Sequence, residues 1–208
     1  MDIKKIAIIL AIVVIAVGII LLSKQVPVSI KESKKSYITI GSFKIPKNAS
    51  YFSIKLPFEN NSRIPDIYTC KNIDVSPAIR FENLPNNTKS ILVIVEDPDA
   101  PSGSFIHWIL YIPDKLDYVP EALAKSDMVA LENITLYQGF NDFGELGYRG
   151  PCPPPGKEHK YIFLALAFDK RFDIMPDFTK EYILNFLNNE STMNHMVGYS
   201  YIIGLFST

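Results

Sequence analysis

Short apolar runs alternate with turn-forming clusters along most of this chain of 208 residues. The two strongest runs are SILVIVE at residues 90–96 and HWILYI at 107–112, which are dense in Ile, Val and aromatic residues and are therefore typical of β-strands. Clusters rich in proline and glycine separate the runs, as expected for turns. Weaker runs of the same kind cover residues 37–45, 51–56, 78–85, 128–137, 160–168 and 197–206.

One segment, residues 177–189, has helical periodicity. Phe178, Tyr182 and Phe186 recur at the spacing of one helix face, and Pro176 stands just before the segment. Because strands do not alternate with long helices elsewhere, the pattern argues against a parallel β-α-β sheet. It predicts a mainly β fold, an antiparallel β-sandwich with one or two peripheral helices.

The N-terminal run is different in kind. Residues 6–22 read IAIILAIVVIAVGIILL, which is 17 residues without a charged or polar side chain. A helix of that length spans roughly 25 Å, the short end of what crosses a bilayer. Lys4 and Lys5 precede it like the basic leader of a secretory signal, but no small-residue cleavage site follows. We therefore expect residues 1–23 to be an uncleaved transmembrane anchor, in preference to a cleaved signal or a buried core helix.

The polar, basic residues 24–36 read as a linker, and residues 37–208 are long enough for one domain with a real core. Lys4 and Lys5 favour an N-terminus in the cytoplasm, although the lysines of the linker pull the opposite way. This predicts a single-pass membrane protein whose domain lies on the extracytoplasmic side.

Sequons of the form Asn-x-Ser/Thr support export of the domain. They start at Asn48, Asn60, Asn86, Asn133 and Asn189. The 13 asparagines of the chain would give only one or two sequons by chance at this content of Ser and Thr. A sequon marks an acceptor only if the chain meets the glycosylation machinery.

Charge and cysteine content exclude other classes. The net charge of −1 gives no electrostatic indication of nucleic acid binding. Cys70, Cys152 and three scattered histidines form no zinc signature, so we expect no metal and no cofactor. In an exported domain the two cysteines could pair, but sequence cannot show that their Cα atoms come within about 7 Å. A disulfide and two free thiols both stay open.

The stretch DPDAPSGSFIHW joins the two strongest strands. Asp97 stands where the first strand leaves the sheet, because Pro98 has no N–H to continue the pairing. Pro98 and Pro101 each restrict the residue before them, so the loop is stiff. His107 then opens the next strand beside Trp108. The arrangement indicates a binding site. The simpler alternative is a rigid loop whose Asp side chains cap their own backbone.

A second stretch, GELGYRGPCPPPGKEHKYIF, begins at residue 144 and has the same design. Gly150 could let the backbone approach a ligand closely. His159 and Tyr161 are two residues apart and share one strand face, whereas Lys160 points to the other. Alone, this loop could be a polyproline connector. Two stiff loops that each deliver a histidine to a strand indicate one shared anion pocket.

Both stretches resemble signatures of the phosphatidylethanolamine-binding protein family, also called the Raf kinase inhibitor protein family, and are closest to its bacterial and archaeal branch. The first signature, Asp-Pro-Asp-Ala-Pro followed by a His on the next strand, is met by residues 97–101 and His107. The second, Gly-x-x-Gly-Tyr-x-Gly-Pro-Cys-Pro-Pro before His-x-Tyr, is met by residues 144–161. A weaker third element is Tyr-Thr-Cys at residues 68–70 with Ser-Pro at 76–77.

The resemblance implies an antiparallel β-sandwich with a small pocket at one end for phosphate, acetate or a phospholipid head group. By the same resemblance, the pocket is expected to be lined by Asp97, His107, Gly150, Pro151, Cys152, His159 and Tyr161. The residues expected to structure the loops are Pro98, Asp99, Pro101 and Trp108.

These residue types suit anion binding. An imidazolium and a tyrosine O–H donate to phosphate oxygens, whereas a carboxylate repels a bare phosphate unless a proton is shared. We therefore expect a membrane-tethered, non-catalytic binder of a small anion or head group. One alternative, from activities attributed to relatives, is an inhibitor or scaffold of a partner protein such as a kinase or protease. The other is a hydrolase in which Asp97 orients His107 as a base, although no Ser or Cys stands out as a nucleophile.

Overall fold

The computed structural model describes residues 36–176 and 178–208. The predicted transmembrane anchor, and the predicted linker apart from Ser36, lie outside the described residues. Among the described residues, no helix is long and apolar enough to cross a bilayer. The described residues form one compact unit.

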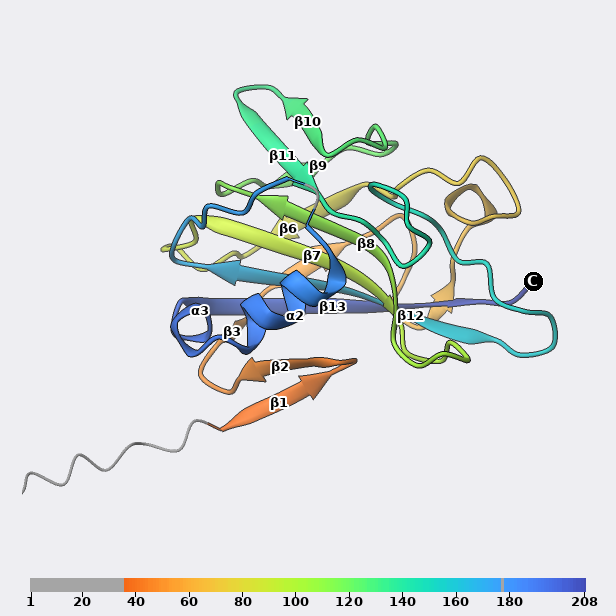
Figure 1. Ribbon diagram of the computed structural model, residues 1–208, viewed down its shortest axis with the longest axis horizontal. Helices are drawn as coiled ribbons and strands as arrows, with labels where there is room; N and C mark the ends of the chain where they lie inside the picture. Colours follow the sequence, from red (N-terminus) through yellow and green to blue (C-terminus); the bar gives the residue numbers. More distant parts are fainter. Residues whose placement is uncertain (1–35, 177) are drawn as a thin grey trace, which may run out of the picture. The chain divides into compact units, whose positions relative to one another are not determined.

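An eight-stranded sheet forms the centre of this unit (Figure 1). Its strands are β3 (Ser50–Tyr51), β5 (Ser62–Arg63), β7 (Ser90–Asp97), β8 (Phe105–Ile112), β10 (Met128–Leu131), β11 (Ile134–Gln138), β12 (His159–Phe168) and β13 (Met196–Phe206). The main order is β10-β11-β8-β7-β12-β13-β3, and β5 also pairs with β13.

The body of the sheet is antiparallel, as predicted, but its edge is not. Every pair from β10 across to β13 is antiparallel. β3 and β5 instead run parallel to β13, over two residues each. Strands this short carry no alternation of their own, so the sequence pattern could not predict their direction.

Three further sets of elements cover the two faces of the sheet. A three-stranded sheet contains β4 (Ser53–Lys55), β6 (Ile79–Glu82) and β9 (Tyr118–Val119). A hairpin contains β1 (Tyr37–Ile40) and β2 (Phe43–Pro46). The helices are the 3-10 helix η1 (Asp66–Tyr68), α2 (Lys180–Asn188) and α3 (Glu190–Asn194).

The hydrophobic core consists of two layers, one on each face of the central sheet. On one face, Val93 and Phe163 pack in a cluster with Phe81 of the three-stranded sheet. On the other, Ile94 and Leu164 belong to a cluster with residues of α2 and of the β1–β2 hairpin. All eight residues of β7 are buried, because alternate side chains enter alternate layers. This explains why SILVIVE reads as a continuous apolar run rather than as an alternating one.

The helix predicted at residues 177–189 corresponds to α2, and the shorter helix α3 follows it. α2 begins at Lys180 because Thr179 is its N-cap, with Oγ1 accepting from the N–H of Tyr182 at 3.4 Å. Phe178, expected inside the helix, is buried in the second core layer before it. Asn189 then ends α2 and caps α3, since its Oδ1 accepts from the N–H of Ser191 at 2.8 Å.

Candidate functional site

A cavity of about 320 Å³ opens at the end of the central sheet where β7 ends and β8 and β12 begin. Figure 1 shows how the three strands meet at this end. Both sequence stretches contribute to it. The lining residues are Asp97, Ala100, Pro101, Ser102, Phe105, His107, Phe143, Cys152, Pro153, Pro154, His159 and Tyr161. The structure thus brings together Asp97, His107, Cys152, His159 and Tyr161, five of the seven residues expected to line one pocket.

A β-bulge places His107 on the pocket side of the sheet. Val95 lies opposite Trp108, but the next residue of β7, Glu96, lies opposite Ile106. His107 is therefore one residue in excess on β8, and it faces the same side as Trp108 instead of the opposite side. The run FIHWILYI contains no glycine or other bulge signal, so sequence reasoning missed this feature.

The imidazole of His107 is held from behind by Arg149. Nδ1 lies 2.7 Å from the carbonyl oxygen of Arg149 and donates to it, since a carbonyl only accepts. The N–H of Arg149 donates in return to the His107 carbonyl at 2.9 Å. Burial lowers the pKa of His107, against smaller opposing effects of the Arg149 carbonyl and the charge of Asp97. At neutral pH the ring is therefore neutral, and Nε2 is a hydrogen-bond acceptor.

Asp97 and His159 form a buried pair. Asp97 Oδ2 accepts from His159 Nδ1 at 2.8 Å, and about 5% of either side chain is exposed. Asp97 Oδ1 accepts from the backbone N–H of Asp99 at 2.8 Å. One carboxylate thus caps its own loop, as the simpler interpretation expected, and also orients a pocket histidine. The ring of His159 is left with Nε2 for a ligand.

Tyr161 has a buried hydroxyl without a partner. The residue is fully buried, and its Oη makes no hydrogen bond to any described residue. Burial, and after it the negative charge of nearby Asp97, raises the pKa of Tyr161 far above its usual value, so the proton stays on. The ring centroid lies 5.2 Å from that of His107 and 6.5 Å from that of His159. An unpaired buried donor costs about 1–3 kcal/mol, so this O–H is available to an acceptor, either the nearby Asp97 carboxylate or an oxygen of a ligand in the cavity.

Asp99 fixes the 97–104 loop to the start of β12. Its Oδ2 accepts from the backbone N–H of Lys160 at 3.0 Å, and its Oδ1 pairs with Lys157 Nζ at 3.5 Å. The Lys160 N–H is the main cause that lowers the pKa of Asp99. Pro98 directly follows β7 and stiffens the loop, and Pro101 lines the cavity. The loop is therefore a rigid part of the cavity wall.

Two phenylalanines form an apolar rim that sequence reasoning missed. The rings of Phe105 and Phe143 lie 4.8 Å apart, and each contacts His107, at 5.3 and 5.4 Å. Phe143 is 42% exposed although it lines the cavity. Phe105 could have been found, because it lies two residues before His107, whereas Phe143 comes from a loop without a motif.

Gly150 and Pro151 do not line the cavity, in contrast to the prediction. The N–H of Gly150 donates to Asp74 Oδ1 at 2.6 Å, and a Cβ at this position would lie 2.2 Å from the carbonyl oxygen of Tyr68. The carbonyl of Pro151 accepts from the N–H of Cys70 at 3.1 Å. The glycine therefore permits close packing against residues 68–74 rather than close approach to a ligand.

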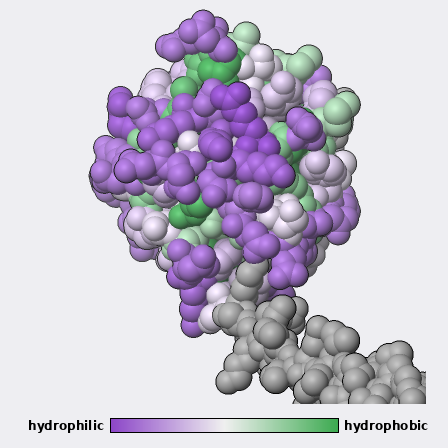
Figure 2. All heavy atoms as spheres, turned by 90° about the vertical axis from the view of Figure 1, so that its left-hand side faces the viewer, coloured by the Kyte–Doolittle hydropathy of each residue, from purple (hydrophilic) through white to green (hydrophobic). Residues whose placement is uncertain are grey.

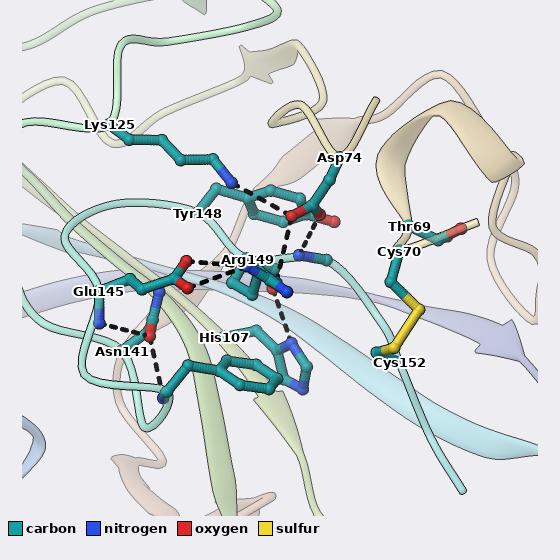
Figure 3. A network of polar contacts seen from close by, with 12 residues as sticks. Thr69, Cys70, Asp74, His107, Lys125, Asn141, Glu145, Tyr148, Arg149 and Cys152 are labelled. Atoms are coloured by element: carbon teal, nitrogen blue, oxygen red, sulfur yellow. Dashed lines mark hydrogen bonds and ion pairs between the residues drawn. A yellow bond between two sulfur atoms is a disulfide. The ribbon is translucent and has the colours of Figure 1, made fainter. Parts of the chain in front are cut away.

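Cys70 and Cys152 form a disulfide, with Cα atoms 5.4 Å apart (Figure 3). This resolves the alternative that the sequence left open, because the separation falls within the usual range for such bridges. Cys152 is exposed and lines the cavity, whereas Cys70 follows η1. The bridge thus connects the pocket wall covalently to the η1 segment.

Asp74 organises the polar network behind His107 (Figure 3). Besides the Gly150 N–H, it pairs with Lys125 Nζ at 3.1 Å and with Arg149 Nε at 3.3 Å. Arg149 also pairs with Glu145 at 2.9 Å. Since Arg149 holds His107 through its backbone, Asp74 positions the histidine indirectly. No motif indicated this residue, which lies in a polar loop of the sequence.

Trp108 belongs to the core rather than to the pocket loop. It is fully buried in the first core layer, and its Nε1 donates to Gln138 Oε1 at 2.8 Å. The Gln138 amide in turn donates to the carbonyls of Ala124 and Ser126 at 2.7 and 2.8 Å. The loop that Trp108 supports is therefore the one at residues 124–126, and not the expected loop at 97–104.

A second cavity, of about 490 Å³, lies at the other end of β8, between the β10–β11 hairpin and residues 171–176. The buried hydroxyl there is satisfied, because Tyr111 Oη donates to the Phe172 carbonyl at 3.0 Å and accepts from its N–H at 2.7 Å. The surface at this end is largely hydrophilic, with apolar residues in small separate areas (Figure 2).

Comparison with known proteins extends the resemblance of the motifs to most of the domain. The sequence model of the phosphatidylethanolamine-binding protein family matches residues 55–202. The UPF0098 protein of Pyrococcus abyssi is 38% identical over 150 residues, which are 72% of this chain and 81% of that protein. The UPF0098 protein of Archaeoglobus fulgidus is 38% identical over 159 residues, and this chain spans only about half of its length, 52%.

Two solved structures have the same fold. A homologue of phosphatidylethanolamine-binding protein from Chlamydia trachomatis matches with a TM-score of 0.63 and 29% identity, over 77% of this chain and 99% of that chain. YbcL of Escherichia coli, described as a member of the mammalian family of such proteins, matches with a TM-score of 0.66 and 25% identity, over 76% and 99%.

Proposed function

The chain belongs to the phosphatidylethanolamine-binding protein family, and we propose that its cavity binds a small protonated anion, phosphate or a phosphorylated head group, without catalysis. The observation that carries the proposal is the buried hydroxyl of Tyr161, which bonds to no described residue at normal hydrogen-bond distance and lies in a cavity that two histidines line. An anionic oxygen would supply the acceptor, and a charge-assisted hydrogen bond contributes about 1.5–3 kcal/mol.

The proton of the ligand matters, because neutral His107 accepts at Nε2. Inorganic phosphate carries an O–H at neutral pH that can donate to this nitrogen, whereas a phosphate monoester, whose second pKa is about 6, carries one only near or below that pH. The other oxygens of the ligand accept from the Tyr161 hydroxyl. The charge of Asp97 is already engaged by His159 and by the N–H of Asp99, which reduces its repulsion of the ligand. This differs from the expectation of an imidazolium at His107 and predicts a preference for protonated anions.

Binding is tested by calorimetry and thermal unfolding of the purified full-length protein with phosphate, phosphoethanolamine and sulfate. Ligand at ten times Kd should stabilise the protein by about 1.4 kcal/mol. Sulfate has a similar size but no proton at neutral pH, so it should bind at least tenfold more weakly than phosphate. Equal binding of the two anions, or no stabilisation by any of them, contradicts the proposal.

Tyr161→Phe separates binding from folding. The variant loses one donor to the ligand, so its affinity should fall about tenfold or more. The unliganded protein should be as stable as the original or more stable, because a buried unpaired hydroxyl is removed. Lys160→Ala is the matched control on the neighbouring position. Its side chain is exposed and only its backbone N–H is used, by Asp99, so affinity should not change.

The proposal includes a membrane tether formed by residues 6–22, with the domain outside the cytoplasm. It is supported by the uninterrupted apolar run and its basic leader. Protease added to intact cells should degrade the domain and leave a short membrane fragment. Recovery of the intact domain in the soluble cytosolic fraction would refute the tether but not the anion site.

A further inference from the structure

The asparagines of the five sequons lie in turns and at a helix junction, although Thr88 of the Asn86 sequon is buried. Each of these asparagines is exposed. Asn86 lies in a turn that the N–H of Thr88 closes onto the Pro85 carbonyl at 3.0 Å, and Asn133 lies in the turn of the β10–β11 hairpin. Asn189 uses Oδ1 to cap α3 and keeps Nδ2 for other contacts. A sugar on Nδ2 would therefore extend into solvent without displacing these backbone hydrogen bonds.

Four of the five asparagines gather at one end of the domain, although they are distant in sequence. Asn86 precedes the start of β7, whose other end carries Asp97 of the pocket. Asn133 lines the second cavity, at the end of β8 away from His107.

The remaining two follow from the register of β13. Asn189 precedes β13, whose first residue pairs with Phe168, the end of β12 away from the pocket. Asn48 precedes β3, which pairs with Gly198 and Tyr199 near that same start of β13. All four thus lie at the end of the domain opposite the anion pocket.

The fifth sequon, at Asn60, lies elsewhere. Its Oδ1 accepts from the N–H of Ile203 at 2.9 Å, and the adjoining Ser62 pairs with Gly204, which lies opposite Tyr161 of the pocket. Asn60 is therefore the internal comparison for the other four.

The first described residue, Ser36, also lies at the sequon-rich end. Its carbonyl accepts from the N–H of Lys47 at 2.9 Å, directly beside Asn48.

We infer that Asn48, Asn86, Asn133 and Asn189 carry N-linked glycans, which cover the end of the domain that holds Ser36 and leave the anion pocket uncovered. The donor is a polyprenol-phosphate-linked oligosaccharide. The bond from its anomeric carbon to the phosphate oxygen breaks, a bond from that carbon to asparagine Nδ2 forms, and one Nδ2 proton leaves with the lipid phosphate. The inference rests on the proposed export of the domain, and not on anion binding.

The test is glycopeptide mass spectrometry of the protein purified from its native cells, together with protease treatment of intact cells. Peptides that contain the four asparagines should carry sugar, with fragment ions of hexose or N-acetylhexosamine type. Unmodified asparagines at all four positions in a domain that external protease reaches would overturn the glycans while leaving export intact. Sugar on Asn60 alone would also overturn the inference.

Matched variants separate glycan loss from structural damage. Ser191→Ala removes the sequon of Asn189 but keeps its side chain and the backbone N–H that it caps. It should abolish sugar at Asn189 only, and Asn188→Gln, an exposed neighbour outside any sequon, should change nothing. Phosphate should bind equally to the native protein and to a variant without the four sequons. A loss of phosphate affinity in that variant would contradict the assignment of the sugars to the end away from the pocket.

Discussion

Removal of the Cys70–Cys152 disulfide should destabilise the domain strongly, because the bridge closes a long loop. The two cysteines are 82 residues apart in sequence. The chain-entropy relation for a loop of that size gives a loss of about 15 cal/mol/K from the unfolded state, or about 4.5 kcal/mol at 25 °C. For a domain of this size, that corresponds to a fall in Tm of roughly 10–18 °C.

Urea unfolding with and without a thiol reductant measures this effect. Reduction should lower the unfolding midpoint, and it should raise the m-value, because an unfolded chain without the cross-link exposes more surface. The variant Cys70→Ser/Cys152→Ser should match the reduced protein and should not respond to the reductant. The reasoning fails if reduction leaves the midpoint unchanged, or if the native oxidised protein titrates with two free thiols.

Three further outcomes test the packing and the electrostatics of the site. Gly150→Ala should lower the free energy of unfolding in urea by about 3 kcal/mol, because its Cβ would meet the Tyr68 carbonyl at 2.2 Å. Gly103→Ala is the control, since no atom lies within 4 Å of its Cβ, and it should cost only about 1 kcal/mol for its left-handed φ of 87°. Equal losses in the two variants would contradict this reasoning. The pKa of Asp99 is lowered by the Lys160 N–H from its ordinary value of 3.8, so its contribution to stability is present above that pH and is lost as pH falls through the folded-state pKa. Asp99→Asn should therefore flatten the acid loss of unfolding free energy below about pH 4. Burial lowers the pKa of His107 from 6.5, so its contribution is full above that pH and is lost on acidification, and an NMR titration midpoint at or above 6.5 would be inconsistent with the structure.

Much of the fold could be predicted, because its strands are long apolar runs between turn residues. The prediction failed where two elements share one run. Residues 128–137 are a hairpin whose turn uses Glu132 at a φ of 51°, a conformation usually assigned to Gly or Asn. Residues 51–56 similarly divide between two sheets around Phe52. The first break is marked only by the two polar residues Glu132 and Asn133, and the second has the apolar Phe52 at its centre, so neither carries a strong turn signal.

The residues that line the pocket could be predicted from the motifs, but the residues that hold them in place could not. Strand alternation at the end of β7 and at the start of β12 is enough to predict the common orientation of Asp97, His159 and Tyr161. The roles of Gly150 and Asp74 depend on packing between loops about 75 residues apart, a distance that the sequence does not reveal. The disulfide was undetermined for the same reason, because it requires a distance between two loops rather than a local pattern.

Because of the bulge on β8, the position of the His107 ring depends on the number of residues in the strand rather than on the types of its neighbours. Conservative replacement of Ile106 or Phe105 would leave the imidazole in the cavity, because the extra residue remains. Deletion of a single residue between Phe105 and Trp108 would restore regular pairing with β7 and remove the position that the ring now occupies. In the evolution of this chain, one-residue insertions and deletions in β8 are therefore expected to be rarer than substitutions. A sequence alignment that misplaces a gap by one position in β8 would identify the wrong residue of a relative as the counterpart of His107.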